Sequence, residues 1–312
     1  MINKKTLVGA GLGVAALLLS ACGGGGDPLG GTSAQPSGGG SSSAAGGEIV
    51  VGSADFTESK ILAEIYSQAL KAKGLQSSTK LGIGAREIYI KALQDKSISA
   101  VPEYTGNLLL NFDAKATAKT AADLDTALPK ALPSDLKVLK SSPAIDQDVY
   151  VVTKDYAAKN GIASLADLKK VAADSVLGGP PELENRAYGP KGLEKVYGAK
   201  FKSFTPYAKY PPKIADLDSG KIQVAEFFTT DAVIAEKGYV ELKDPESLIL
   251  PQNVIPLVRS DVADNATAVG ALNAVQAALT TDDLTTLDKK VDSDHDDPDQ
   301  VAGDWLKSKG LA

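Results

Sequence analysis

The sequence predicts an α/β protein with two lobes, because short β-branched runs alternate with helical segments and because the folded part is long. The chain has 312 residues, 43% of them hydrophobic and 23% charged, which are the proportions of a globular protein. The folded part begins near Glu48 and extends over about 265 residues, more than a single core comfortably holds. The alternation also predicts mostly parallel sheets with both faces covered.

The first residues have the pattern of a secretory signal. Lys4-Lys5 precedes an apolar run from Leu7 to Leu19, and the small residues Ser20-Ala21 follow it, so we expect residues 1–21 to be a signal peptide. Cys22 is the only cysteine of the chain, and its string resembles a bacterial lipobox, in which the thiol is acylated after cleavage. A free thiol or an intermolecular disulfide is the alternative.

Residues 22–47 form a low-complexity tether. From Gly23 to Gly47, 11 of the 25 residues are glycine and 5 are serine. Such a composition buries almost no apolar surface, so we expect a flexible coil with a root-mean-square reach of about 25–30 Å. Together with an acylated cysteine, this tether predicts a lipid-anchored protein at the extracytoplasmic face of the cell membrane.

Two strand-and-helix units open the folded part. Ile49–Val51 is a β-branched run that ends in small residues, and Thr57–Lys73 has helical apolar spacing. Gly74 follows at the position of a helix C-cap. The second unit is an extended segment over Thr79–Ile83 and a helix that reaches Leu93. In such units the N–H groups of the helix N-terminus point toward any ligand that lies above the strand.

The same alternation continues along the chain. The predicted elements are a strand over Val149–Thr153, a helix start with a capping box at Ser164–Asp167, a strand over Val176–Gly179, a helix over Gly192–Tyr197, a helix over Lys213–Ser219 and a strand over Ile222–Ala225. The last helix starts after Asp297, with proline in its first position, and ends at Gly310.

Charge and histidine content exclude several function classes. The formal net charge of −6 repels phosphate backbones, so we expect no nucleic acid partner. His295 is the only histidine, which removes most His-based catalysis and zinc sites. The acidic run around it departs from a calcium loop, since Asp297 stands at position 6 and Gly303 at position 12. We therefore expect no catalytic residue, no metal and no cofactor.

Four short strings occur in an order that resembles a known family. They are Gly52-Ser53-Ala54-Asp55-Phe56-Thr57-Glu58-Ser59, Pro102-Glu103-Tyr104-Thr105-Gly106, Thr229-Thr230-Asp231 and Val301-Ala302-Gly303-Asp304-Trp305-Leu306. In this order they resemble the substrate-binding protein of osmoprotectant ABC importers, which carry glycine betaine, choline and carnitine. The resemblance extends from Glu48 to the C-terminus, and its second string is fairly specific.

The resemblance implies an α/β, two-lobed periplasmic-binding-protein-like fold of type II with two hinge strands. Lobe 1 is then expected over residues 48–149 plus 254–312, and lobe 2 over residues 150–253. The resemblance further implies a monomer without enzymatic activity, which encloses a small-molecule solute between its lobes and delivers it to an ABC permease in the membrane.

The resemblance also implies a ligand site. A quaternary ammonium group has no N–H to donate and is weakly hydrated, so aromatic faces hold it best. By motif, Tyr104, Tyr150 and Phe228 match the walls of an aromatic cage. Arg186 matches an arginine that grips a carboxylate with its planar fork. The other expected ligand-binding residues are Asp148, Asn107, Gln252 and Thr230.

Three positions depart from the family's pattern. Ala54 replaces a lysine, Ser59 replaces a glutamine, and Gln252 stands where a late aromatic residue is expected. A lost cage wall lowers affinity, because one cation–π contact contributes about 0.5–2 kcal/mol. One alternative is therefore the same fold retuned to an aromatic or polyol compound, which could stack on Tyr188, Tyr207 and Tyr210. A cell-surface enzyme or an adhesion lipoprotein is the alternative from another class.

Overall fold

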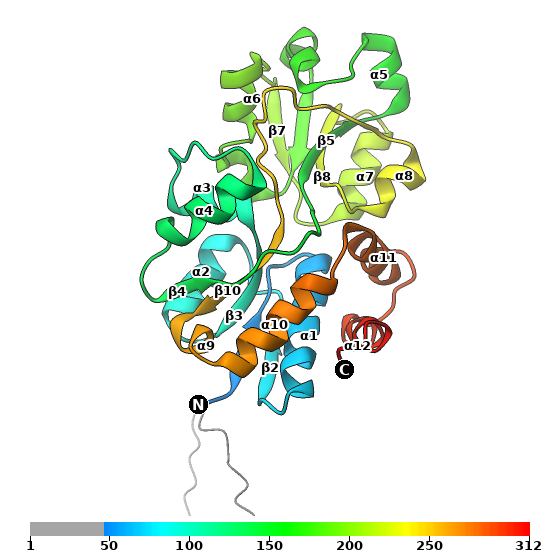
Figure 1. Cartoon of the computed structure of the whole chain (residues 1–312). Coiled ribbons are helices and arrows are strands. Elements are labelled where there is room, and N and C mark those ends of the chain that lie inside the picture. The colour runs from blue at the N-terminus through cyan, green and yellow to red at the C-terminus, as the bar shows by residue number, and fades with distance from the viewer. Residues whose placement is uncertain (1–46) are drawn as a thin grey trace, which may run out of the picture. The chain divides into compact units, whose positions relative to one another are not determined.

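The computed structural model describes residues 47–312, which form two lobes, each built on a five-stranded sheet (Figure 1). The expected signal peptide, the lipidation site Cys22 and the linker up to residue 46 lie outside the described residues. Within residues 47–312, no helix combines the length and the apolarity that a membrane span requires.

Lobe 1 is the part built on the sheet with strand order β2-β1-β3-β10-β4. Its strands are β1 (Ile49–Gly52), β2 (Ser77–Lys80), β3 (Ala100–Tyr104), β4 (Leu136–Val138) and β10 (Val254–Arg259). Its helices are α1 (Thr57–Ala72), α2 (Arg86–Gln94), α3 (Thr105–Phe112), α4 (Ala121–Ala131), α9 (Ser260–Ala263), α10 (Ala266–Ala278), α11 (Thr281–Asp292) and α12 (Pro298–Ser308).

Lobe 2 is built on the sheet with strand order β7-β6-β8-β5-β9. Its strands are β5 (Asp148–Val152), β6 (Val176–Gly179), β7 (Ser203–Pro206), β8 (Val224–Phe228) and β9 (Val240–Glu241). Its α-helices are α5 (Lys154–Asn160), α6 (Pro190–Tyr197), α7 (Tyr210–Asp218) and α8 (Ala232–Lys237). Three short 3-10 helices complete it: η1 (Leu165–Lys170), η2 (Ala172–Asp174) and η3 (Pro181–Asn185).

Both sheets are mixed, which corrects the prediction of mostly parallel sheets. In lobe 1, β1 pairs in parallel with β2 and β3, but β10 runs antiparallel to β3 and β4. In lobe 2, β6 pairs in parallel with β7 and β8, but β5 runs antiparallel to β8 and β9. The reason is that β5 and β10 enter their sheets directly from the other lobe, without a covering helix that would bring the chain back parallel.

Two chain segments connect the lobes and lie side by side. Ile145 and Asn253 form an antiparallel bridge. Beside it, the Ser142 N–H donates to the carbonyl of Val254 at 2.8 Å, and the Asp146 N–H donates to the carbonyl of Gln252 at 3.2 Å. These backbone bonds hold the two crossings together next to the cleft, which is where a hinge between the lobes must lie.

Helix α1 is the central helix of the lobe 1 core. Its face with Ile61, Leu62 and Ile65 is at most 1% exposed, as the helical spacing predicts. Helices α10, α11 and α12 pack against it. Helix α12 starts at Asp297, whose side chain accepts from the Asp299 N–H at 2.9 Å, as expected for an N-cap. This packing places the carboxyl groups of α11 beside α1.

Candidate functional site

A cavity lies between the lobes, with about 290 Å³ of space that water can enter. Its lining comes from the ends of strands and the starts of helices in both lobes: the loop after β1, the start of α2, the end of β3, the start of β5, the loop after β6 and the end of β8. A space of this size is near the lower limit for small-molecule sites, so it suits a compact solute.

Three aromatic rings from both lobes meet at this cavity. Phe56 follows β1 and Tyr104 ends β3, so both belong to lobe 1, whereas Phe228 ends β8 in lobe 2. The centroid of the Phe56 ring lies 5.3 Å from that of Phe228 and 6.1 Å from that of Tyr104. Phe56 therefore joins the aromatic surfaces of the two lobes.

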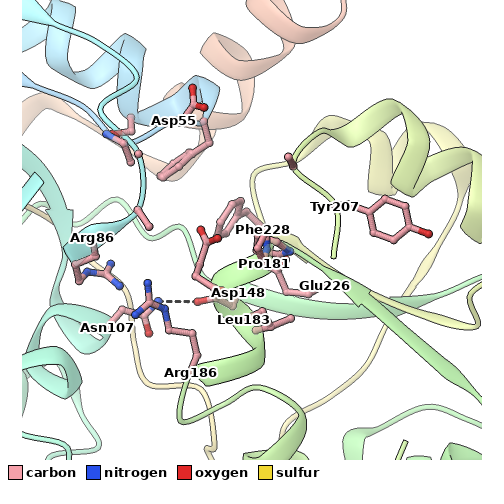
Figure 2. Close-up of a pocket in the computed structure, with 18 of the residues that line it drawn as sticks. Asp55, Arg86, Asn107, Asp148, Pro181, Leu183, Arg186, Tyr207, Glu226 and Phe228 are labelled. Atoms are coloured by element: carbon pink, nitrogen blue, oxygen red, sulfur yellow. Dashed lines mark hydrogen bonds between the residues drawn. The ribbon is translucent and has the colours of Figure 1, made fainter. Parts of the chain in front are cut away.

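A buried carboxylate faces the same space. Asp148 begins β5 directly opposite Phe228, because the antiparallel register pairs these two residues. The Asn107 amide donates from Nδ2 to Asp148 Oδ2 at 2.8 Å (Figure 2). The same nitrogen lies 3.1 Å from the Tyr188 hydroxyl. Burial raises the pKa of Asp148, and the Asn107 amide opposes this effect.

A second buried carboxyl group belongs to β8. Glu226 Oε2 lies 3.9 Å from Lys213 Nζ, and that ammonium also donates to the Glu226 carbonyl at 2.6 Å. Burial raises the pKa of Glu226 well above its usual range; Lys213 opposes the shift, and Asp148 adds to it. Burial thus disfavours the charged forms of both Asp148 and Glu226.

Two arginines lie on one side of the cavity, near Asn107 (Figure 2). Arg86 forms a bidentate pair with the buried Glu103, with Nε–Oε1 at 2.7 Å and Nη2–Oε2 at 3.0 Å. Arg186 of lobe 2 reaches Glu87 of lobe 1, with Nη1–Oε1 at 2.5 Å and Nη2–Oε2 at 3.3 Å. Both guanidinium groups are thus already paired with carboxylates of the chain.

Residues 47–308 match the family model for the substrate binding domain of ABC-type glycine betaine transport systems. The chain belongs to this family. The family consists of extracytoplasmic substrate-binding proteins of ABC importers and not of enzymes, so this chain is such a protein.

Two curated relatives support the assignment. The chain is 28% identical to the glycine betaine-binding protein YehZ of Escherichia coli (strain K12), over 84% of this chain and 90% of that protein. It is 25% identical to the ergothioneine transport permease/ergothioneine binding protein EgtU of Helicobacter pylori (strain G27), over 84% of this chain and 48% of that protein.

The fold is shared with a solved structure of a glycine betaine/carnitine/choline ABC transporter. That structure has a TM-score of 0.67 and 21% identity, and the match covers 84% of this chain and 99% of the other. The predicted type II periplasmic-binding-protein fold is therefore confirmed.

The string Pro102 to Gly106, which carried much of the family resemblance, has a structural reason at each position. Pro102 and Tyr104 line the cavity, and Glu103 holds Arg86. Thr105 donates from Oγ1 to the carbonyl of Pro251 at 3.1 Å, which ties the end of β3 to the returning crossing segment. Gly106 leaves room for that segment: a Cβ there would lie 2.7 Å from the Pro251 carbonyl oxygen.

The eight expected ligand-binding residues fall into two groups. Five of them line the cavity: Tyr104, Phe228, Arg186, Asp148 and Asn107. The other three lie behind the lining: Tyr150, Gln252 and Thr230.

The second group holds neighbouring residues in position. The Tyr150 hydroxyl donates to the Tyr188 carbonyl at 2.7 Å, and Gln252 Oε1 accepts from the Asn107 N–H at 3.0 Å. Thr230 donates to Glu58 Oε2 at 3.1 Å.

Two of the three positions that depart from the family's pattern lie at the cavity, and the third, Gln252, lies behind its lining. Ala54 and Ser59 line the cavity, and Ser59 Oγ accepts from the Ala54 N–H at 2.9 Å. Tyr188, Tyr207 and Tyr210 line it as well. The Tyr207 hydroxyl donates to Asp216 at 2.5 Å, which fixes this ring at the lobe 2 side.

The site residues predicted from the sequence do not include Phe56, Arg86, Lys213 or Glu226. The sequence nevertheless holds a signal for Arg86 and for Glu226. Arg86 opens a helix directly after a small-residue loop, where side chains face the space above the sheet. Glu226 interrupts an apolar strand, and a charged residue inside such a strand requires a buried partner, which here is Lys213.

Proposed function

We propose that this protein captures a quaternary ammonium solute of the glycine betaine or choline type between its lobes and delivers it to an ABC permease. The observation that carries the proposal is the meeting of Phe56, Tyr104 and Phe228 from both lobes at one cavity. Their ring faces attract a weakly hydrated cation that has no N–H to donate.

The buried carboxylate supports the same class of ligand. Asp148 accepts from Asn107 and faces no arginine or lysine at hydrogen-bond distance among residues 47–312. A cation between Asp148 and the aromatic rings would stabilise this charge, because Coulomb attraction is strong where water is excluded. Binding by rings of both lobes would also bring the lobes together.

A ring-bearing solute is a second candidate. Tyr188, Tyr207 and Tyr210 line the cavity and offer stacking surfaces. One relative, in Helicobacter pylori, is named as an ergothioneine binding protein. The test of function therefore includes this compound.

Calorimetry with glycine betaine, choline, carnitine and ergothioneine tests the proposal. We expect saturable one-to-one binding of glycine betaine, choline or carnitine. Ergothioneine also carries a trimethylammonium group, so binding of ergothioneine alone would favour the ring-bearing solute. Absence of heat with every compound, at protein concentrations that detect millimolar affinity, contradicts the proposal.

We further propose that the protein is a monomer anchored to the membrane through acylated Cys22. The support is the apolar run before this cysteine and the glycine-rich tether after it. The variant Cys22→Ser should appear in the culture fluid or remain an uncleaved precursor. A variant that fractionates and migrates like the parent contradicts the anchor.

A further inference from the structure

We propose that Glu87 is a specificity-determining residue, which disfavours solutes with a carboxylate by occupying Arg186 at the rim of the cavity. The inference rests on the proposed function, since it concerns the choice between zwitterionic and purely cationic trimethylammonium solutes. It starts from the charges that line the cavity.

Three buried or half-buried cationic side chains line the cavity, and each has a carboxylate partner among residues 47–312. Arg86 pairs with Glu103, and Lys213 lies 3.9 Å from Glu226. Arg186, with 16% of its side chain exposed, pairs with Glu87. A solute carboxylate therefore meets guanidinium groups whose charge is already paired, and two of the five N–H donors of each arginine are in use.

Of the two arginine pairs, only that of Arg186 can open readily. Glu103 is fully buried and also accepts from the Tyr89 hydroxyl at 2.7 Å, so it is fixed. The Glu87 side chain is 56% exposed, and Arg186 is its only side-chain hydrogen-bond partner within the described part of the chain. Because it keeps contact with water, Glu87 can swing away at a modest cost.

The pair nevertheless shifts the balance between two solutes. Hydrogen bonding to Arg186 lowers the pKa of Glu87, so this carboxylate stays ionised and competes with an incoming carboxylate. Glycine betaine and choline share the trimethylammonium group, but only betaine carries a carboxylate. The carboxylate of betaine competes with Glu87 for Arg186, whereas choline leaves the pair intact.

The test compares the affinities of choline and glycine betaine for the parent and for Glu87→Gln. Glutamine keeps the shape of the side chain but removes its charge, which frees Arg186. We expect the ratio of the two dissociation constants to move in favour of betaine by about three- to tenfold. Loss of the lobe–lobe contact by itself weakens only choline, whose complex keeps the Arg186–Glu87 pair. The inference therefore also requires that the dissociation constant of betaine itself falls in Glu87→Gln.

Two further variants separate release of Arg186 from a general change in charge. Glu182→Gln removes one charge from the cavity lining, where Glu182 makes no hydrogen bond among residues 47–312. In this variant the ratio of the dissociation constants of choline and betaine should stay within about twofold of that in the parent. Adding Arg186→Gln to Glu87→Gln should abolish the gain for betaine, because the freed group is then absent.

Failure of this inference differs from failure of the proposed function. An unchanged ratio in Glu87→Gln, or an equal shift in Glu182→Gln, overturns the role of Glu87 while solute binding stands. If the parent binds neither solute and Glu87→Gln gains neither, the proposed function fails and this inference fails with it.

Discussion

Tyr104 acts through two separate parts of its side chain. Its ring lies at the cavity beside Phe56, whereas its hydroxyl donates to Glu58 Oε1 at 2.5 Å in a buried contact. In the proposed function a bound cation contacts the ring, whereas the hydroxyl stabilises the fold through Glu58. The two parts can be tested independently.

For Tyr104→Phe we expect nearly unchanged affinity for a quaternary ammonium solute, and a loss of about 1–2 kcal/mol in the free energy of unfolding, since Glu58 loses a donor. For Tyr104→Ala we expect binding weaker by roughly 5- to 30-fold. Calorimetry and urea unfolding measure the two effects. If the phenylalanine variant stays folded but no longer binds, the ring is not the part that holds the solute.

Gly106 is a glycine because the crossing segment passes directly over it. A Cβ there would lie 2.6 Å from Leu250 Cβ and 2.7 Å from the Pro251 carbonyl oxygen. We therefore expect Gly106→Ala to lower the free energy of unfolding by about 1–3 kcal/mol.

Gly270 in α10 is the matched control for Gly106, since a Cβ at Gly270 meets no atom within 4 Å. Gly270→Ala should raise stability by about 0.5–1 kcal/mol through helix propensity. Urea unfolding of both variants measures the contrast. Equal effects of the two substitutions would mean that the close approach at Gly106 has no energetic consequence.

At the scale of elements, α1 and α11 of lobe 1 bring carboxyl groups against lobe 2. The groups that line a small second pocket are Glu58, Asp146, Asp231, Asp288 and Asp292. Burial raises the pKa of Glu58, Asp146 and Asp288 well above their usual ranges, and it raises that of Asp231 to about 6. Asp288 Oδ1 has no hydrogen-bond partner in the described residues.

These shifts predict that stability falls as the pH rises. Because folding raises the pKa values, the folded chain binds protons more tightly than the unfolded chain does. The resulting stabilisation is complete below the unfolded aspartate pKa of 3.8 and is lost as the pH rises through the folded values, which for Asp231 means about 6. We expect a lower free energy of unfolding at pH 8 than at pH 5.

Asp288→Asn should make the free energy of unfolding depend less on pH, because the substitution removes one charge from a cluster of like charges. We expect it to raise the free energy of unfolding at alkaline pH by about 1–2 kcal/mol. Asp282 lies on the exposed side of the same helix, so Asp282→Asn should leave the pH dependence of the free energy of unfolding as it is in the parent. Urea unfolding between pH 5 and pH 8 measures how the free energy of unfolding of each variant changes with pH. An equal change in the parent and in Asp288→Asn would contradict a destabilising charge at Asp288.

The sequence predicts where helices start, but it does not predict the direction of every strand in the sheets. Helix starts follow local chemistry, so the capping box at Ser164 and the N-cap at Asp297 are found where expected. Sheet topology depends on the route of the chain between lobes, which no local pattern encodes, so the antiparallel placement of β5 and β10 was not predicted.

The same distinction applies to the site. Tyr104 lies at the cavity because its motif ends a strand there, whereas Tyr150 lies two residues inside β5 and donates to the Tyr188 carbonyl instead. The pairing of Arg186 with Glu87 joins two lobes, so the arginine was predictable from its motif but its partner was not.

At the scale of the whole molecule, aromatic and polar contacts join the lobes around the cavity. Among them are the Phe56–Phe228 contact, the Arg186–Glu87 pair and the Asn107–Asp148 bond. Without a solute, such contacts compete with repulsion between the buried carboxyl groups, so we expect the lobes to separate by bending at the two crossing segments.

Small-angle scattering with and without a verified solute measures this bending. We expect the radius of gyration to fall when solute is added, with lobe 1 and lobe 2 moving as two bodies. The Tyr104→Ala variant should show no change at solute concentrations that saturate only the parent. A radius that stays constant in the parent contradicts closure.

The most direct test of the central claim is a calorimetric comparison of choline with its neutral isostere 3,3-dimethylbutan-1-ol, in which carbon replaces the charged nitrogen. The two molecules have nearly the same shape, so their difference in affinity reports the attraction of the cavity for a positive charge. Since the rings of Phe56, Tyr104 and Phe228 and the Asp148 carboxylate face this cavity, we expect choline to bind at least about tenfold more tightly. Equal affinities would contradict a cation site.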